Sequence, residues 1–264
     1  MVYTLKPLLQ GKMTSPIGLM VMYGDMRTLS TGPVYVWYVE GAKEKILVDA
    51  GIPAPGPDGM VGLWPVEGGG EEGLRAVLGE VNTKPEEIDI LILTHLHFDH
   101  CFGATLFKNA RIYVQKKEWE FAFNPLPTMR AGYHRSQFEP LENMDMVLVD
   151  GDYELMEGLK LMLLPGHTLG QQGLALSTEK GTAVLTGDLA SNYCNLKPEM
   201  SEITDLKGNK IQLLPRPDLP FNPNGVHVNL TDWFDSMWKV VRTASKRELI
   251  YPGHEGTLAG RTLP

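Results

Sequence analysis

The chain has 264 residues, of which 43% are hydrophobic and 21% charged, as is typical of a globular protein with a full-sized core. Its formal net charge of −8 disfavours nucleic acid or an anionic membrane as the main partner, because both require a basic surface. No stretch approaches the ~18 apolar residues of a membrane span, and no secretory signal is recognisable at the N-terminus. Two cysteines, Cys101 and Cys194, are too few for a disulfide framework. We therefore expect a cytoplasmic protein with one domain over residues 1–264.

Many short apolar strands with a few helices between them predict an α/β fold. Residues 33–40 and 45–51 resemble the two strands of a hairpin, and residues 89–94 form a continuous apolar run, typical of a strand covered on both faces. Further strands are predicted at residues 111–115, 145–149, 159–165, 172–177, 182–188 and 247–253.

Helical spacing of apolar residues predicts helices over residues 69–81 and 229–246, the second capped by Asn229 or Thr231. Residues 52–70, 120–143 and 190–228 show no clear pattern. Loops of this length in a compact domain are often lids or binding loops, although irregular surface or a dimer contact explains them equally simply.

The stretch "THLHFDH", residues 94–100, places four potential metal ligands directly after an apolar strand. His95 and His97 are two residues apart, so in an extended chain both rings project to the same side. Asp99 and His100 follow where a helix is expected to begin, and they face a neighbouring point. Packing does not explain such a cluster, and two adjacent ions use its side chains with less strain than one.

Three further candidate ligands each follow an apolar strand, where a loop begins. They are His167 in "LPGHTLG", Asp188 in "VLTGD" and His254 in "YPGHEG". Taken singly, each resembles a structural residue at a strand end, but strand ends of one sheet can converge on a common edge. We expect one ion on His95, His97 and His167, a second on Asp99, His100 and His254, and Asp188 bridging them. Imidazole and carboxylate ligands favour zinc, and also suit iron, cobalt or manganese.

Two other histidines, His134 and His227, lie in the unassigned loops and are not expected to be ligands, although a contact of either with the substrate is an alternative. Cys101 is interpreted as a small buried apolar residue.

The order of "THLHFDH", "PGHTLG", "LTGD" and "YPGHE" resembles that of the metallo-β-lactamase superfamily. The resemblance implies a four-layer αββα sandwich with a dinuclear metal site at the sheet edge, and it places Asp49 beside the metals. His97 stands where flavodiiron proteins have Glu, and Asp188 where secreted zinc β-lactamases commonly have Cys. The acidic chain also lacks the basic surface of tRNA-processing nucleases.

The closest subgroup is that of the N-acyl-homoserine lactone hydrolases, on the strength of "PVYVWYVEGAKEKILVDAGI" and "LPGHTLGQQGLAL". In that subgroup a Tyr shortly after the bridging Asp contacts the substrate carbonyl. Tyr193 is the nearest Tyr here, but it follows Asp188 by five residues, a longer gap than is usual. A thioesterase similar to glyoxalase II is the rival, although that family adds a C-terminal helical domain.

We therefore expect a dinuclear metal-dependent hydrolase that opens a small lactone or ester by attack of a metal-bridging hydroxide. Asp99 is expected to shuttle the proton and Tyr193 to stabilise the oxyanion. The alternatives are an amide, cyclic imide or β-lactam hydrolase, or a thioesterase, using the same site, and a metal-binding protein without catalysis.

The substrate is expected to be a small molecule held by apolar loop residues, and the aromatic loops suggest a homodimer. The pocket candidates are Trp64, Phe121, Phe123, Met129, Tyr133, Tyr193 and Phe221, with Met20, Met22 and Met26.

Overall fold

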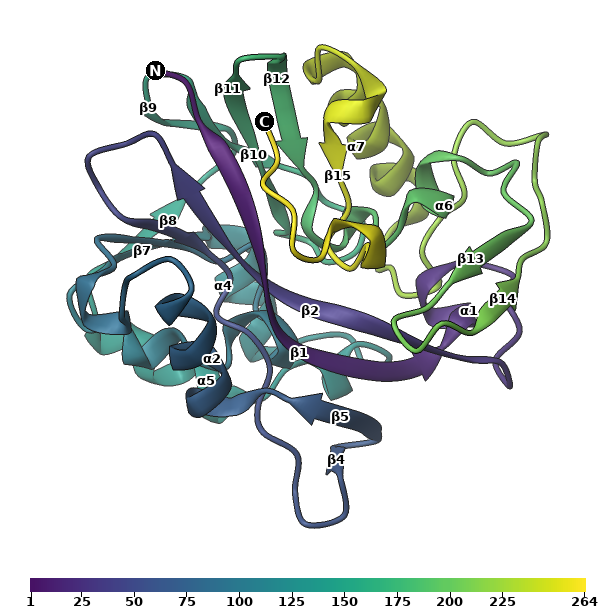
Figure 1. Cartoon of the computed structure of the whole chain (residues 1–264), viewed down its shortest axis with the longest axis horizontal. Helices are drawn as coiled ribbons and strands as arrows, with labels where there is room; N and C mark the ends of the chain where they lie inside the picture. Colours follow the sequence, from purple (N-terminus) through teal and green to yellow (C-terminus); the bar gives the residue numbers. More distant parts are fainter.

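The computed structural model describes all of residues 1–264 and contains two β-sheets packed face to face, with helices on both outer surfaces (Figure 1). The first sheet has eight strands, namely β1 (Thr4–Pro16), β2 (Leu29–Glu40), β3 (Ile46–Val48), β4 (Met60–Val61), β5 (Trp64–Gly68), β6 (Ile90–Ile92), β7 (Arg111–Gln115) and β8 (Met146–Val149). The second has five, namely β9 (Tyr153–Met156), β10 (Leu159–Leu163), β11 (Gln172–Thr178), β12 (Gly181–Leu185) and β15 (Ile250–Tyr251).

The eight-stranded sheet has the order β4-β5-β1-β2-β3-β6-β7-β8. Its first part is antiparallel, and β3, β6, β7 and β8 are parallel to one another. Strand β6 is buried along its whole length between two parallel neighbours, as its continuous apolar run predicts. The five-stranded sheet has the order β15-β12-β11-β10-β9, and β12 pairs with β15 in parallel.

The main core lies between the two sheets and is built by alternation along the strands. On β2, Tyr35, Trp37 and Val39 point into this core, whereas Val36 and Tyr38 point to the opposite face. On β6, Ile90 and Ile92 likewise point into the core between the sheets, and Leu91 points to the opposite face. Side chains of an extended strand alternate between its two faces, so the eight-stranded sheet needs a second covering layer.

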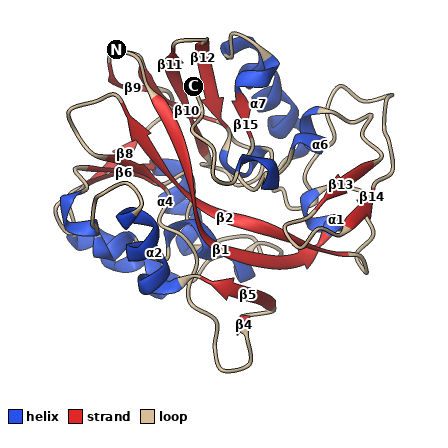
Figure 2. Cartoon of the chain, viewed as in Figure 1, coloured by secondary structure: helices blue, strands red, loops and turns tan.

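Helices supply that layer on each outer surface (Figure 2). The eight-stranded sheet is covered by α2 (Gly70–Gly79), α4 (Lys116–Phe123) and α5 (Arg135–Phe138), and the five-stranded sheet by α7 (Leu230–Thr243). The α/β sandwich expected from the sequence is therefore confirmed, with the order helices, sheet, sheet, helix.

The two predicted helices are present, and Asn229 caps α7 by accepting hydrogen bonds from the backbone N–H groups of Thr231 and Asp232. The predicted strands are also present, most of them with shorter ends. Strand β1, the longest in the protein, was not among them. None of the helices combines the length and the apolar character that crossing a bilayer demands.

Short elements occupy the segments that had no clear pattern. Residues 52–70 carry β4 and β5, residues 120–143 end α4 and contain α5, and residues 190–228 contain α6 (Tyr193–Leu196) and a hairpin of β13 (Glu202–Thr204) and β14 (Lys210–Gln212). A further turn of helix, α1 (Ile17–Met20), follows β1.

Candidate metal centre

The seven predicted ligands follow strands that end on the same side of the two sheets. His95 and His97 come just after β6, and Asp99 and His100 lie on α3 (Phe98–Cys101). The other three follow strands of the five-stranded sheet, His167 after β10, Asp188 after β12 and His254 after β15. Both sheets therefore contribute ligands, and the metal site expected at the sheet edge lies where the strand ends of the two sheets meet.

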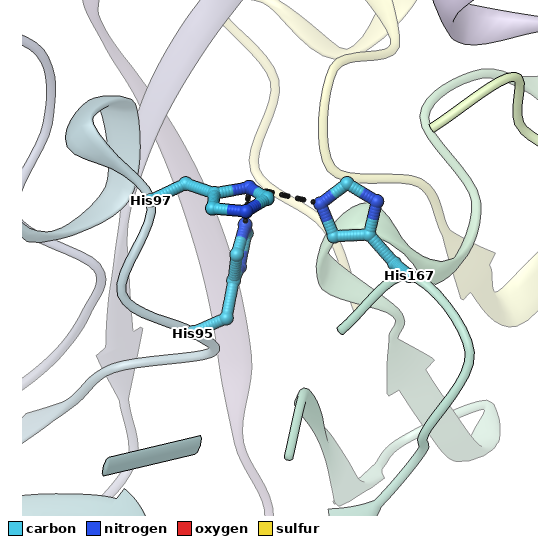
Figure 3. Close-up of side chains that lie close together, drawn as sticks. All are labelled: His95, His97 and His167. Carbon is cyan, nitrogen blue, oxygen red and sulfur yellow. Dashed lines mark hydrogen bonds between the residues drawn. The ribbon is translucent and has the colours of Figure 1, made fainter. Parts of the chain in front are cut away.

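The first group, here called the three-histidine set, is His95, His97 and His167 (Figure 3). Nδ1 of His97 lies 3.0 Å from Nε2 of His95 and 3.1 Å from Nε2 of His167. Two nitrogens bound tetrahedrally to one zinc ion at about 2.0–2.1 Å are about 3.4 Å apart. The spacing of the three nitrogens is thus close to that of a shared metal ion.

The second group, here called the carboxylate set, is Asp99, His100 and His254, whose ligand atoms also converge. Asp188 lies between the two sets. Its Oδ1 is 2.9 Å from Nε2 of His254 and 3.3 Å from Nε2 of His100, and its Oδ2 is 3.7 Å from Nε2 of His167. One carboxylate therefore faces both groups with different oxygens.

Outer hydrogen bonds orient the histidine rings. Nδ1 of His100 lies 2.8 Å from Oδ2 of Asp49, which also accepts from the Thr94 hydroxyl, whereas Oδ1 of Asp49 accepts from the Thr94 backbone N–H. Nδ1 of His167 donates to the Val226 carbonyl oxygen and Nδ1 of His254 to that of Pro33. In a neutral ring a proton on Nδ1 leaves a lone pair on Nε2, and in His100, His167 and His254 it is Nε2 that faces the cluster.

Burial and neighbouring charges separate the protonation of the two sets. Burial, together with the nearby imidazoles, holds the pKa of His95 and His97 well below the ordinary value. Burial alone would lower the pKa of His254, but the Asp188 carboxylate raises it to about 9. Burial alone would raise the pKa of the Asp188 carboxyl, but the neighbouring His254 and His100 hold it well below its usual range. Neutral imidazoles and ionised carboxylates are the forms that bind metals.

Unpaired polar atoms show that the residues fit divalent cations. Nε2 of His100 and Oδ1 of Asp188 are buried without a hydrogen-bond partner, although they lie within the cluster. An unsatisfied buried donor or acceptor costs about 1–3 kcal/mol, and more for a charged group. A cation among these atoms removes that cost, and the clusters are therefore consistent with a dinuclear metal site.

A cavity of about 220 Å³ opens beside the cluster. Part of its lining is polar and includes the predicted ligands His97, Asp99, His167, Asp188 and His254. The apolar part includes Leu19, Met20, Trp64, Phe98, Met129 and Val226. The arrangement places a small apolar compartment directly against the metal ligands.

Tyr193, the predicted oxyanion donor, does not line this cavity. It begins α6 and lines a neighbouring cavity on the far side of His254, where burial raises its pKa to about 12. Its backbone N–H donates to Glu255. The tertiary structure thus places Tyr193 outside the cavity beside the ligands, because the chain leaves the lining of that cavity after Ser191.

Several predicted pocket residues are also placed elsewhere. Trp64, Met129 and Met20 line the cavity, whereas Phe121 and Phe221 belong to the packed cores under the helices. His134 stacks on Phe98 with ring centroids 5.0 Å apart, and His227 bonds to the Asn224 carbonyl oxygen. Neither histidine joins the metal-ligand groups or lines the cavity.

Four residues at the site were not predicted from the sequence. Glu118 is fully buried behind the three-histidine set. Gly132 lies so close to the His97 ring that a Cβ would stand 2.6 Å from its Cδ2. Ser191 and Asn224 line the cavity beside Asp188. None of the four belongs to a recognisable motif. Ser191 alone has a sequence signal, because it follows the predicted ligand Asp188 by only three residues.

A model of the metallo-beta-lactamase superfamily matches residues 29–254. The match includes all seven predicted ligands, so the chain belongs to the metallo-β-lactamase superfamily, in agreement with the resemblance in its motifs.

More specific relatives are N-acyl homoserine lactonases. One of Bacillus sp is 33% identical over 180 residues, which cover 64% of this chain and 68% of that protein. N-acyl homoserine lactonase AttM of Azorhizobium caulinodans is 30% identical over 172 residues, covering 60% and 65%. The chain is thus a metallo-hydrolase related to these enzymes.

Solved structures agree in fold. A quorum-quenching N-acyl homoserine lactone hydrolase superposes with a TM-score of 0.75 at 24% identity, over 97% of this chain and 94% of that one. The dizinc quorum-quenching lactonase AidC gives 0.67 at 18% identity, over 96% and 88%.

Proposed function

We propose that this protein is a dinuclear metal-dependent hydrolase that opens small lactones, with N-acyl homoserine lactones as the favoured substrates. The observation that carries the proposal is the convergence of seven buried ligand side chains at the wall of an apolar cavity. The relationship to N-acyl homoserine lactonases supports the choice of substrate.

The three-histidine set would hold one divalent cation and the carboxylate set the other, with Asp188 shared between them. Zinc is the proposed metal, because imidazole with carboxylate is its usual ligand combination when no thiolate is present. Cys101 and Cys194 are both buried and lie outside the ligand groups.

Bound there, two such cations supply Lewis acidity at the substrate carbonyl and lower the pKa of a water molecule. The overall reaction adds water across the ester: one O–H bond of the water and the ring C–O bond break, the water oxygen bonds to the acyl carbon, and the proton passes to the ring oxygen, which becomes a hydroxyl of the opened product. Asp99 is the proposed carrier of this proton. Its Oδ2 lies 3.7 Å from Nε2 of His100 and 3.9 Å from Nε2 of His254, and the residue lines the cavity.

The cavity supports a small substrate with an apolar tail. Its volume of about 220 Å³ lies below the roughly 300–1,000 Å³ of pockets for drug-sized ligands, which disfavours polymers. A lactone ring set against Asp99 and Asp188 would leave an N-acyl chain beside Leu19, Met20 and Met129. Polar and apolar parts of such a substrate thus meet matching parts of the lining.

The test is a substrate panel on protein whose metal content has been measured. We expect N-acyl homoserine lactones to have a kcat/KM at least tenfold above those of thioesters, amides, β-lactams and phosphodiesters. Removing the metals with a chelator should abolish turnover, and adding zinc should restore it. Full activity of metal-free protein would contradict the mechanism, and faster turnover of another ester class would contradict the substrate.

A further inference from the structure

Glu118, on α4, is a fully buried carboxylate without a cationic partner. Its Oε1 accepts a hydrogen bond of 3.0 Å from the Leu96 backbone N–H and one of 2.8 Å from the Tyr133 hydroxyl. Its Oε2 accepts one of 2.5 Å from the Thr168 hydroxyl. All three donors are neutral, and the two oxygens together join three segments far apart in the sequence.

Each of these donors adjoins the three-histidine set. Leu96 lies between the two histidines that follow β6, and Thr168 directly follows His167. Tyr133 packs its ring against that of His97, with centroids 4.7 Å apart. Glu118 therefore ties the loop after β6 to the turn after β10, and these two segments carry all three members of the set.

The carboxylate set has a different anchor. Asp49 receives Nδ1 of His100 and both polar hydrogens of Thr94, and it makes no contact with the donors of Glu118. The Thr94 hydroxyl also lies 3.1 Å from Nδ1 of His95. Asp49 thus reaches His100 directly and His95 through Thr94, whereas Glu118 contacts only segments beside the three-histidine set.

Burying a carboxylate without a cation is expensive, and an apolar residue of similar size often costs less. Glu118 is retained at this cost in a position where two of its hydrogen-bond donors, Leu96 and Thr168, lie on the segments that carry the ligand histidines. A role in general packing does not account for that choice of partners, because most of the surrounding core of α4 is apolar.

We propose that Glu118 is a positioning residue, which sets the separation of the His95–His97 loop from the His167 turn and thereby tunes metal affinity at the three-histidine set alone. This inference rests on the proposed function, since it requires that the set bind a metal. It concerns a residue that need not touch substrate or metal.

Zinc titration of metal-free protein, in competition with a chromophoric chelator and without substrate, tests the inference. Wild type should bind two zinc ions. Glu118→Ala should weaken one of them by about 10–100-fold, the usual effect of losing an outer partner of a ligand, and leave the other within about threefold. Glu118→Gln should lie closer to wild type, because its amide oxygen still accepts from Leu96 and Tyr133.

Two further variants assign the weakened site. His167→Ala should remove the zinc site of the three-histidine set and leave the other. Adding Glu118→Ala to it should not change the zinc affinity of that remaining site, because both substitutions act on the three-histidine set. Asp205→Ala is the matched control. Asp205 is another buried carboxylate without a cationic partner, and it accepts hydrogen bonds from Thr31, Lys207 and Asn209 rather than from neighbours of the ligands. Both zinc affinities should be unchanged in it.

Unchanged binding of both ions by Glu118→Ala, or equal weakening of both, would overturn the inference. Wild type that binds fewer than two ions would instead refute the proposed function, so the two failures are distinct. If Glu118→Ala does not fold, Thr168→Ala takes its place, because it removes the bond to Oε2 alone. A loss of zinc affinity at one site, smaller than that expected for Glu118→Ala, supports the inference. Unchanged zinc affinity at both sites overturns it.

Discussion

Asp188 and His254 approach each other to 2.9 Å, between a carboxylate oxygen and Nε2, although they follow different strands of the five-stranded sheet. The same oxygen lies 3.3 Å from His100, and the other faces His167. Asp188 is thus the side chain common to both ligand sets.

This position leads to a first prediction. Asp188→Ala should lower zinc affinity at both sites, by more than the roughly 100-fold that loss of an outer partner can cost. Hydrolysis should fall below detection at the same time. The measurement is metal content by mass spectrometry beside kcat/KM, and a variant that retains two ions with wild-type turnover would exclude a bridging role.

Asp49 is predicted to have two separable roles. Its backbone has a φ of 63°, in the left-handed region that Asn and Asp tolerate better than other residues, and its carboxylate orients His100. Asp49→Asn should keep the backbone and weaken one zinc ion by about 10–100-fold. Asp49→Ala should in addition lower the free energy of unfolding by roughly 1–2 kcal/mol, the cost of this conformation. Equal stability of the two variants in urea would contradict the backbone argument.

Gly132 is predicted to leave room for the His97 ring. A Cβ at this position would stand 2.6 Å from Cδ2 and 2.8 Å from Nε2 of His97, so either the ring or the loop must move. Gly132→Ala should destabilise the fold by about 1–3 kcal/mol and reduce kcat/KM at least tenfold. Gly79→Ala is the control, because nothing lies within 4 Å of the position that its Cβ would take. A Gly132→Ala enzyme with normal kinetics would show that the loop yields freely.

Trp64 is predicted to contact the acyl chain of the substrate, since it contributes to the apolar lining of the cavity. Trp64→Ala should raise KM for long-chain lactones by about fourfold for each CH₂ group that loses its contact, which corresponds to ~0.8 kcal/mol. The KM for short-chain lactones should change little. Trp238→Ala serves as control, because Trp238 is outside the cavity. A uniform rise in KM across all chain lengths would place the chain elsewhere.

The family resemblance implies that Tyr193 contacts the substrate, whereas its position in the fold predicts that it does not. It lines the cavity behind His254 rather than the one beside the ligands. Tyr193→Phe should therefore keep kcat within about twofold, whereas loss of an oxyanion donor typically costs 10²–10³-fold. A hundredfold fall with unchanged metal content would mean that the tyrosine reaches the substrate after movement of α6.

Local patterns predicted the elements whose signals are contained within one segment. Strand β6 is apolar throughout because it lies between two parallel strands, and α7 begins at Asn229 because a side-chain oxygen satisfies its free N–H groups. Strand β1 escaped prediction, because Pro7 and Gly11 interrupt its alternation and a register shift lies between Leu9 and Gly11. Its length is set by pairing with β2, which is a long-range contact.

The sequence by itself determined the kinds of ligand, their order and their place after apolar strands, because a cluster such as HxHxDH has few uses apart from metal binding. Only the tertiary structure decided that two sheets supply the ligands, that Tyr193 turns away, and that Glu118, which reads locally as an ordinary surface helix residue, is buried behind three histidines. The physical reason is the distance along the chain over which each property is set. Residue type and spacing are local properties, whereas burial and ring orientation depend on distant segments that meet only when the sheets pack.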